Sequence, residues 1–101
     1  MKNINLEKRI KLKTGFFKKE SYLLILKDKE IKLKPEEKNN SEEFKIEIPS
    51  IKTVTISGKN SQEIEIITEA ESFVGNFIDE DDISEIILFL KIIFDSKFNY
   101  N

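Results

Sequence analysis

Cysteine, histidine and tryptophan are absent from this 101-residue chain. Without cysteine there is neither a disulfide nor a thiol nucleophile, and without histidine there is no imidazole general base. A zinc ion would have to be held by carboxylates alone, which is an unusual ligand set. No phosphate-binding loop or pair of acids with contrasting surroundings replaces these groups. We therefore predict a protein that is not an enzyme, with no catalytic residues, no cofactor and no metal.

Long apolar runs are also absent. No run reaches the roughly 18–20 residues that a membrane-spanning helix needs. Residues 1–7 lack the apolar centre of a signal peptide. These two absences predict a cytoplasmic protein.

What the chain does contain is apolar and charged residues, at 39% and 36% of the total, with 17 isoleucines that favour strands. The length fits a single domain, residues 1–101. The net charge is −2 but is unevenly spread: residues 1–38 sum to +6 and residues 39–101 to −8. These charges are either the solvated outer faces of strands, or surfaces through which the basic half meets an anion or unlike halves meet between subunits.

Short segments in which apolar and polar residues alternate predict seven strands within residues 8–78, after a lead-in over residues 1–7. The first has Ile10 and Leu12 on its inner side, and the fifth has Val54 and Ile56. Residues 18–21 are predicted to connect the first two strands, and residues 35–43 to form a polar loop. The predicted strands span residues 8–13, 22–26, 30–34, 44–48, 51–57, 63–67 and 73–78.

One amphipathic helix is predicted over residues 79–95, followed by a tail over residues 96–101. Its first residues, Asp79, Glu80, Asp81 and Asp82, suit the capping of a helix N-terminus, and they have neither the glycine nor the spacing of a calcium loop. Six apolar residues recur at helical spacing and form one stripe that faces a core: Ile83, Ile86, Ile87, Leu90, Ile93 and Phe94.

A second apolar face of the same helix is formed by Leu88 and Ile92, with Phe89 on a flank. One interpretation is that this face is covered by the tail (Phe98, Tyr100) or by the first residues (Ile4, Leu6). The other is that Leu88, Phe89 and Ile92 form an interface with a second subunit or a protein partner.

A cluster of lysines, Lys11, Lys13, Lys18 and Lys19, accompanies the pair Phe16 and Phe17. One hypothesis is contact with an anionic surface, with the aromatic residues inserting at the interface. The simpler interpretation makes Phe16 a core residue and the lysines a solvated strand face. Nucleic-acid binding is not predicted, because the chain is acidic overall and has no recognition helix or base-stacking motif.

Two stretches resemble the bacterial pleckstrin-homology (PH)-like and GRAM-type domains. The first is Gly15-Phe16-Phe17 followed by Tyr22-Leu23-Leu24-Ile25-Leu26-Lys27-Asp28-Lys29-Glu30-Ile31, and the second runs from Phe44 through Ile48-Pro49-Ser50-Ile51-Lys52-Thr53-Val54. The resemblance implies a mainly-β fold with one C-terminal α-helix, a partly open, seven-stranded antiparallel barrel of four and three strands capped by that helix.

Domains with such folds bind lipids, peptides or other proteins, or form homo-oligomers. Lys13, Lys18 and Lys19 match the places where lipid-binding members carry basic residues. The second strand, residues 22–26, lacks the basic residue of that pattern, and Glu20 lies within the loop. The resulting expectation is a non-catalytic interaction or assembly module that self-associates or binds a protein partner. The alternative is weak binding of anionic lipid or a phosphate ligand through the lysines of the first hairpin.

Overall fold

Eight β-strands and one α-helix make up the described part of the chain in this computed structural model, namely residues 6–37, 42–58, 62–78 and 83–101. Short 3-10 turns follow β4, at Ile48–Ser50, and α1, at Asp95–Lys97. The elements are β1 (Leu6–Lys13), β2 (Lys19–Leu26), β3 (Glu30–Pro35), β4 (Phe44–Glu47), β5 (Ile51–Ser57), β6 (Glu63–Thr68), β7 (Ser72–Phe77), α1 (Ser84–Phe94) and β8 (Phe98–Tyr100).

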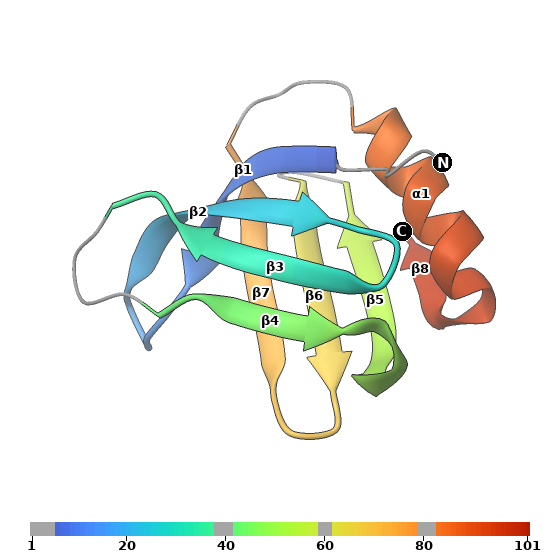
Figure 1. Cartoon of the computed structure of the whole chain (residues 1–101). Helices are drawn as coiled ribbons and strands as arrows, with labels where there is room; N and C mark the ends of the chain where they lie inside the picture. Colours follow the sequence, from blue (N-terminus) through green and yellow to red (C-terminus); the bar gives the residue numbers. More distant parts are fainter. Residues whose placement is uncertain (1–5, 38–41, 59–61, 79–82) are drawn as a thin grey trace.

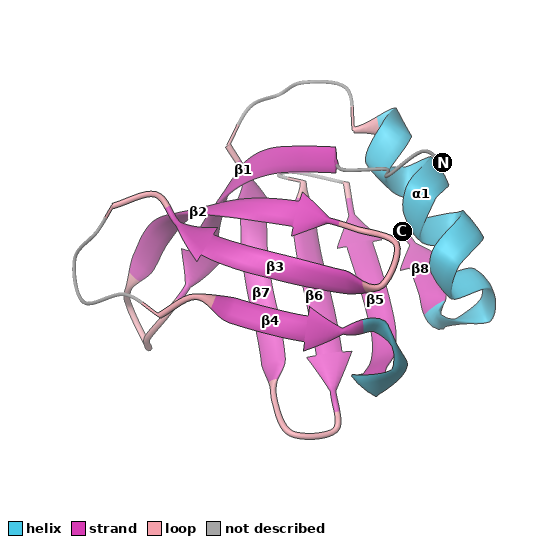
Figure 2. Ribbon diagram, in the orientation of Figure 1, coloured by secondary structure: helices cyan, strands magenta, loops and turns pink. Residues whose placement is uncertain are grey.

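The strands form one sheet in the order β4-β3-β2-β1-β7-β6-β5-β8. Every pairing is antiparallel except that of β8 with β5. The sheet folds over on itself, so that β2, β3 and β4 cross in front of β5, β6 and β7, and α1 lies at one end (Figure 1). The helix is the main non-strand element at that end (Figure 2). The predicted fold class, an open, mainly-β fold with a C-terminal helix, is therefore confirmed.

The two halves of the sheet join where β1 pairs with β7, and Gly75 permits their close approach. Gly75 lies opposite Leu12 in the register. A Cβ atom at this position would lie 3.0 Å from Ile10 Cδ1 and 3.2 Å from the Lys11 carbonyl oxygen. A Cβ here would require Ile10 Cδ1 and the Lys11 carbonyl to move aside by a few tenths of an ångström, so glycine fits this junction for steric reasons.

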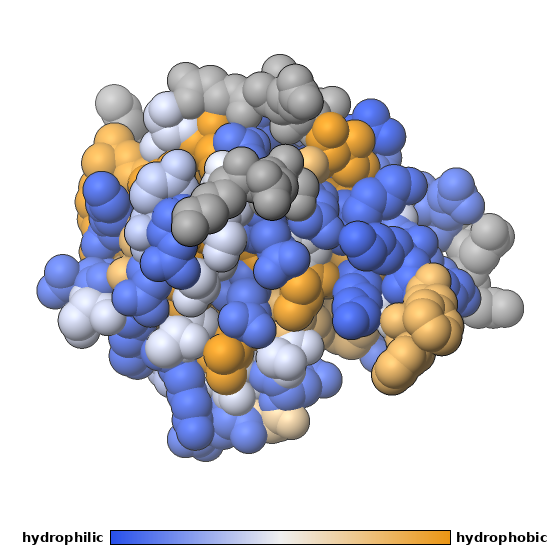
Figure 3. Space-filling model, turned by 180° about the vertical axis from the view of Figure 1, so that it is seen from behind, coloured by the Kyte–Doolittle hydropathy of each residue, from blue (hydrophilic) through white to orange (hydrophobic). Residues whose placement is uncertain are grey.

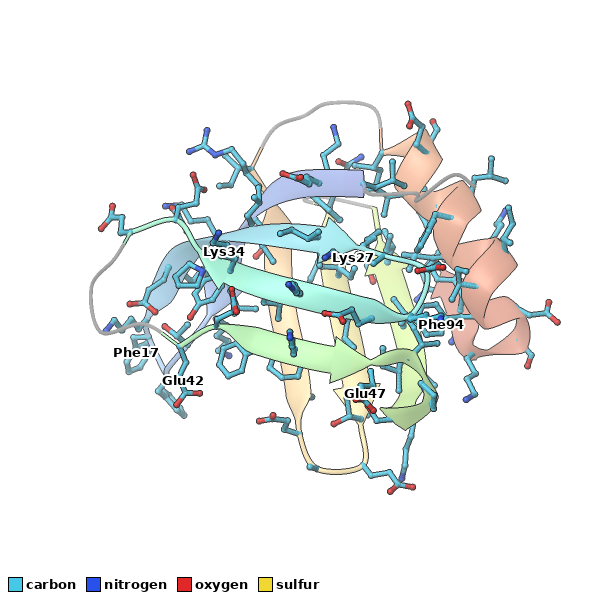
Figure 4. The ribbon with its side chains drawn as sticks, viewed as in Figure 1. Phe17, Lys27, Lys34, Glu42, Glu47 and Phe94 are labelled. Atoms are coloured by element: carbon cyan, nitrogen blue, oxygen red, sulfur yellow. The ribbon has the colours of Figure 1, made fainter. Side chains whose placement is uncertain are left out.

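The core lies between the two layers and under the helix. The alternation in the strands sets which side chains are inside: Ile10, Leu12, Val54 and Ile56 are buried as predicted. The helix stripe also faces this core. Of its six residues, Ile83, Ile86, Leu90 and Phe94 are buried, and Ile87 and Ile93 are half-buried against the same cluster. In Figure 4, Phe94 lies between α1 and the strands.

Several predicted boundaries differ from the structure. β1 begins at Leu6, inside the predicted lead-in, because Leu6 and Glu7 continue the pairing with β2 opposite Leu26 and Ile25. The helix begins at Ser84, and Ile83 precedes it without a side-chain cap hydrogen bond. The predicted cap, residues 79–82, lies outside the described residues.

The predicted tail is also ordered into an element. After Asp95, whose φ of 50° turns the chain back, residues 98–100 form β8 beside β5. Phe98 is buried there, and the Lys97 ammonium donates a hydrogen bond to the Ile51 carbonyl at 3.3 Å. In the described ranges, no helix is both long enough and apolar enough to cross a membrane.

Candidate functional site

The loop between β1 and β2 is a five-residue hairpin connection, residues 14–18. The last paired residues are Lys13 and Lys19. The Thr14 N–H donates to the Lys18 carbonyl at 2.9 Å, and the Lys18 N–H donates to the Gly15 carbonyl at 3.4 Å. The predicted connection over residues 18–21 was therefore wrong, because residues 19–21 already pair with β1.

Two phenylalanines project from this loop into solvent. Phe16 is 85% exposed and Phe17 is 95% exposed. Their rings touch each other edge to face, with centroids 4.8 Å apart and an interplanar angle of 75°. Figure 4 shows Phe17 at the end of the molecule away from α1, and Figure 3 shows an apolar protrusion at the corresponding edge, beside strongly hydrophilic side chains. The interpretation of Phe16 as a core residue was wrong, since the loop extends beyond the core.

A groove lies beside the two rings. Its volume is about 520 Å³. From the hairpin it is lined by Lys13, Phe16, Phe17, Lys18 and Lys19, and from β6 and β7 by Glu63, Val74 and Asn76. Among the described residues, three lysines and one glutamate thus line the groove, which gives it a positive balance next to an exposed aromatic pair.

The four lysines of the cluster differ in their hydrogen-bond and ion-pair partners. The Lys19 ammonium donates to Asn76 Oδ1 at 3.2 Å, and so connects β2 to β7. The Lys18 ammonium lies 3.4 Å from Glu20 Oε1 but its side chain stays 69% exposed, so this ion pair contributes little. Lys11 donates to Ser21 Oγ at 2.9 Å and does not line the groove. The structure therefore brings Lys13, Lys18 and Lys19 together and places Lys11 farther along β1.

Tyr22 follows the cluster on β2, with its side chain directed inward. Its hydroxyl donates a hydrogen bond to the Glu42 carbonyl at 2.7 Å and so connects β2 to the residues before β4. Burial, and to a lesser degree the charges of Glu20 and Glu42, raise the pKa of the Tyr22 phenol above its ordinary value. Tyr22 is therefore neutral at physiological pH and serves as a structural donor.

The second candidate surface is the outer face of α1. Leu88 is 60% exposed and Ile92 is 71% exposed, one turn apart. Phe89 is only 6% exposed and packs in the core, so it does not contribute to this face. The tail does not cover the face, because Phe98 and Tyr100 pair with β5. Leu6 is half-buried in β1, and Ile4 lies outside the described residues.

Sequence reasoning missed the residues that β6 and β7 contribute to the groove, Glu63, Val74 and Asn76. They reach the hairpin because β1 pairs with β7, where Lys11 is opposite Asn76, and β6 lies next in the sheet. No local pattern at residues 63–76 signals that contact. A correct strand order was the information required.

Solved structures of PH domains have a similar fold. The N-terminal PH domain of ARAP2 from human superposes with a TM-score of 0.69 at 19% sequence identity, over 91% of this chain and 80% of that one. The Vps36 N-terminal PH domain has a TM-score of 0.62 at 16% identity, over 91% and 75% of the two chains. No family model and no curated protein matches the chain.

A third likeness is to a chain of the Spt16D–Pob3N heterodimer, with a TM-score of 0.70 at 13% identity. The match spans all of this chain but 55% of that one. The likenesses to the PH domains of ARAP2 and Vps36 define the class of fold as PH-like. At these identities the likeness concerns the fold, and what each domain binds has to be argued from its own surface.

Proposed function

We propose that this chain is a non-catalytic interaction module that docks on anionic membrane surfaces through its β1–β2 loop. The observation that carries the proposal is the exposure of Phe16 and Phe17 beside three lysines. Apolar side chains at the tip of a loop, with cations around them, match the two layers of a membrane surface: anionic headgroups outside and hydrocarbon beneath.

The magnitudes favour reversible binding. Burying the two phenylalanine rings contributes about 1.5–3 kcal/mol each at full burial. Three lysines near an anionic leaflet add about 1 kcal/mol each. From this total of about 6–9 kcal/mol the entropy of association is still to be subtracted. We expect weak association that salt reduces, because salt screens the attraction between the lysines and the anionic lipids.

From the sequence alone, assembly through a protein interface was the first hypothesis and binding to anionic lipid the alternative. Two features of the structure favour lipid binding instead. The exposed apolar face of α1 is limited to Leu88 and Ile92, since Phe89 belongs to the core. The β1–β2 loop instead combines two almost fully exposed rings with a cationic groove. The similarity of residues 15–31 to bacterial GRAM-type domains agrees with a membrane role and stays a prediction.

Co-sedimentation with vesicles tests the proposal. We expect the protein to sediment with phosphatidylcholine vesicles containing phosphatidylserine and to remain in the supernatant with phosphatidylcholine alone. Lys13→Glu/Lys18→Glu/Lys19→Glu removes the binding. Phe16→Ser/Phe17→Ser weakens it at every salt concentration.

The matched control carries the same change of charge on exposed lysines elsewhere: Lys29→Glu/Lys52→Glu/Lys91→Glu. This control should keep a large part of the binding. Equal loss in the two triple variants would mean that net charge alone attracts the protein to the vesicle, which contradicts docking by the loop.

A second candidate function is self-association through Leu88 and Ile92, with a second copy as the occupant. It is favoured by the exposure of these two residues and by the unlike charges of the two halves of the chain. Size-exclusion chromatography with light scattering should then show a dimer that Leu88→Lys/Ile92→Lys converts to a monomer. A chain that is already monomeric at high concentration rejects this candidate.

A further inference from the structure

The free edge of β4 presents main-chain groups that no described strand pairs. β4 is the terminal strand of the sheet, bonded to β3 on one side. The Ile48 N–H donates to the Lys29 carbonyl at 3.2 Å. Because hydrogen-bonded and non-bonded pairs alternate in an antiparallel ladder, Ile46 and Phe44 also point their main-chain groups toward β3. The N–H and carbonyl groups of Lys45 and Glu47 therefore point outward.

A groove runs along this edge. Its volume is about 340 Å³. One wall is the end of the sheet, and the other is the turn between β6 and β7; the lining residues are Phe44, Lys45, Ile46, Ser50, Thr68, Glu69, Ala70, Glu71 and Phe73. The rings of Phe44 and Phe73 meet at its base with centroids 5.1 Å apart. The groove thus places an apolar floor next to unpaired main-chain groups.

The rim of the groove is acidic. Glu69 and Glu71 line it; outside the lining, Glu47 is the last residue of β4 and Glu42 lies two residues before the strand (Figure 4). Lys45 is the one cation among the described residues that line it. The described lining of the groove therefore has more carboxylates than ammonium groups, which favours a segment that carries basic residues.

We infer that the β4 edge binds an extended basic peptide, which adds a strand to the sheet and places an apolar side chain against Phe44 and Phe73. The Lys45 N–H and carbonyl and the Glu47 N–H supply hydrogen bonds to the peptide backbone. The Glu47 carbonyl already accepts from Ser50 Oγ at 2.7 Å. The apolar floor and the acidic rim then select the sequence of the peptide.

The shape of the edge favours a single peptide segment over a second copy of the chain. The turn between β6 and β7 extends past β4 in Figure 1, behind the space in which an added strand would lie. Pairing the β4 edges of two copies would bring the carboxylates of Glu69 and Glu71 of both copies toward one another, which a basic peptide avoids. The four-residue length of β4 and the charge of Lys45 further limit indiscriminate pairing.

Fluorescence anisotropy with a labelled hexapeptide amide, Lys-Val-Lys-Phe-Lys-Val, tests the inference. We expect saturable binding to the full chain, and no binding of the same peptide with glutamate in place of lysine. In nitrogen-15 NMR spectra, the amide signals of residues 44–47 and 68–73 should shift. Glu69→Lys/Glu71→Lys should weaken binding about tenfold, as the loss of one or two charge contacts predicts.

Lys45→Pro is the decisive variant, because it removes an outward N–H where an edge strand tolerates proline. It should weaken binding at least about tenfold, whereas Lys45→Ala, which keeps that N–H, should bind like the wild type. If Lys45→Pro does not fold, a peptide N-methylated at phenylalanine and at the lysine after it replaces it, because one of two consecutive N–H groups points toward β4 in either strand direction. This peptide should bind at least about tenfold more weakly. The inference is overturned if binding does not saturate at millimolar peptide, or if the shifts in the NMR spectra are confined to α1. It is also overturned if Lys45→Pro binds the peptide as tightly as Lys45→Ala does, or if the methylated peptide binds as tightly as the unmodified one.

Discussion

At the scale of single residues, Tyr22 shows how a buried polar group is used structurally. Its ring is stacked near Phe44, with centroids 6.2 Å apart, and its hydroxyl bonds the Glu42 carbonyl. Tyr22→Phe keeps the ring and removes the hydrogen bond. We expect the free energy of unfolding at pH 7 to fall by about 0.5–1.5 kcal/mol, the usual net contribution of one hydrogen bond, measured by urea denaturation.

The difference in the free energy of unfolding between wild type and Tyr22→Phe should also depend on pH. The pKa of Tyr22 is raised in the folded state, so above its ordinary value of 10.0 the unfolded chain loses the proton while the folded chain retains it. Stability from this group is complete below that value and is lost as pH rises above it. The stability advantage of wild type over Tyr22→Phe should therefore shrink above pH 10. An advantage that grows with pH would contradict the assignment.

Residue patterns predicted burial better than they predicted exposure. Ile10, Leu12, Val54 and Ile56 were assigned to the core from alternation, which depends only on neighbouring residues. Phe16 was assigned to the core because it is large and apolar, although its exposure is decided by where the β1–β2 register ends. That register depends on pairing over the whole length of both strands, which no local pattern at Gly15 reveals.

At the scale of elements, α1 presents one face to the core and another to solvent. Leu90 is fully buried, whereas Leu88 is 60% exposed. Leu90→Ala removes packed methyl groups and should lower the free energy of unfolding by about 2–5 kcal/mol. Leu88→Ala, the same substitution two positions away, should change it by no more than about 0.5 kcal/mol.

Urea denaturation of the two leucine variants checks this assignment. A similar loss in both would mean that the outer face of α1 is covered in solution. A dimer interface would cover this face, so the oligomeric state of the same samples should be measured by light scattering. Equal losses in a proven monomer would contradict the placement of the helix.

The helix stripe was predictable because helical spacing is local, and its first residue, Ile83, is buried as expected. The tail was not predictable in the same way. Residues 98–100 pair with β5, more than forty positions earlier in the chain, and only the course of the chain after Asp95 brings them there. The groove beside the β1–β2 loop was unpredictable for the same reason, because β6 and β7 line it only as a result of long-range strand pairing.

At the scale of the whole molecule, each of the two sequence halves of opposite charge provides most of the charged residues that line one groove. The basic half provides Lys13, Lys18 and Lys19 in and beside the β1–β2 loop, and the acidic half provides Glu69 and Glu71 on the rim of the β4 groove. The two grooves contact opposite ends of β6, at Glu63 and at Thr68. One small fold therefore presents a cationic, aromatic site and a separate anionic one.

The central claim is that the β1–β2 loop enters a membrane, and the absence of tryptophan from the sequence allows one substitution to test it. In Phe17→Trp the single indole should show a blue-shifted emission with phosphatidylserine-containing vesicles, and lipids brominated on their acyl chains should quench it. High salt should reduce both effects, because it screens the lysines. Binding to vesicles with an unshifted, unquenched indole would contradict the account, because the loop would then remain in water.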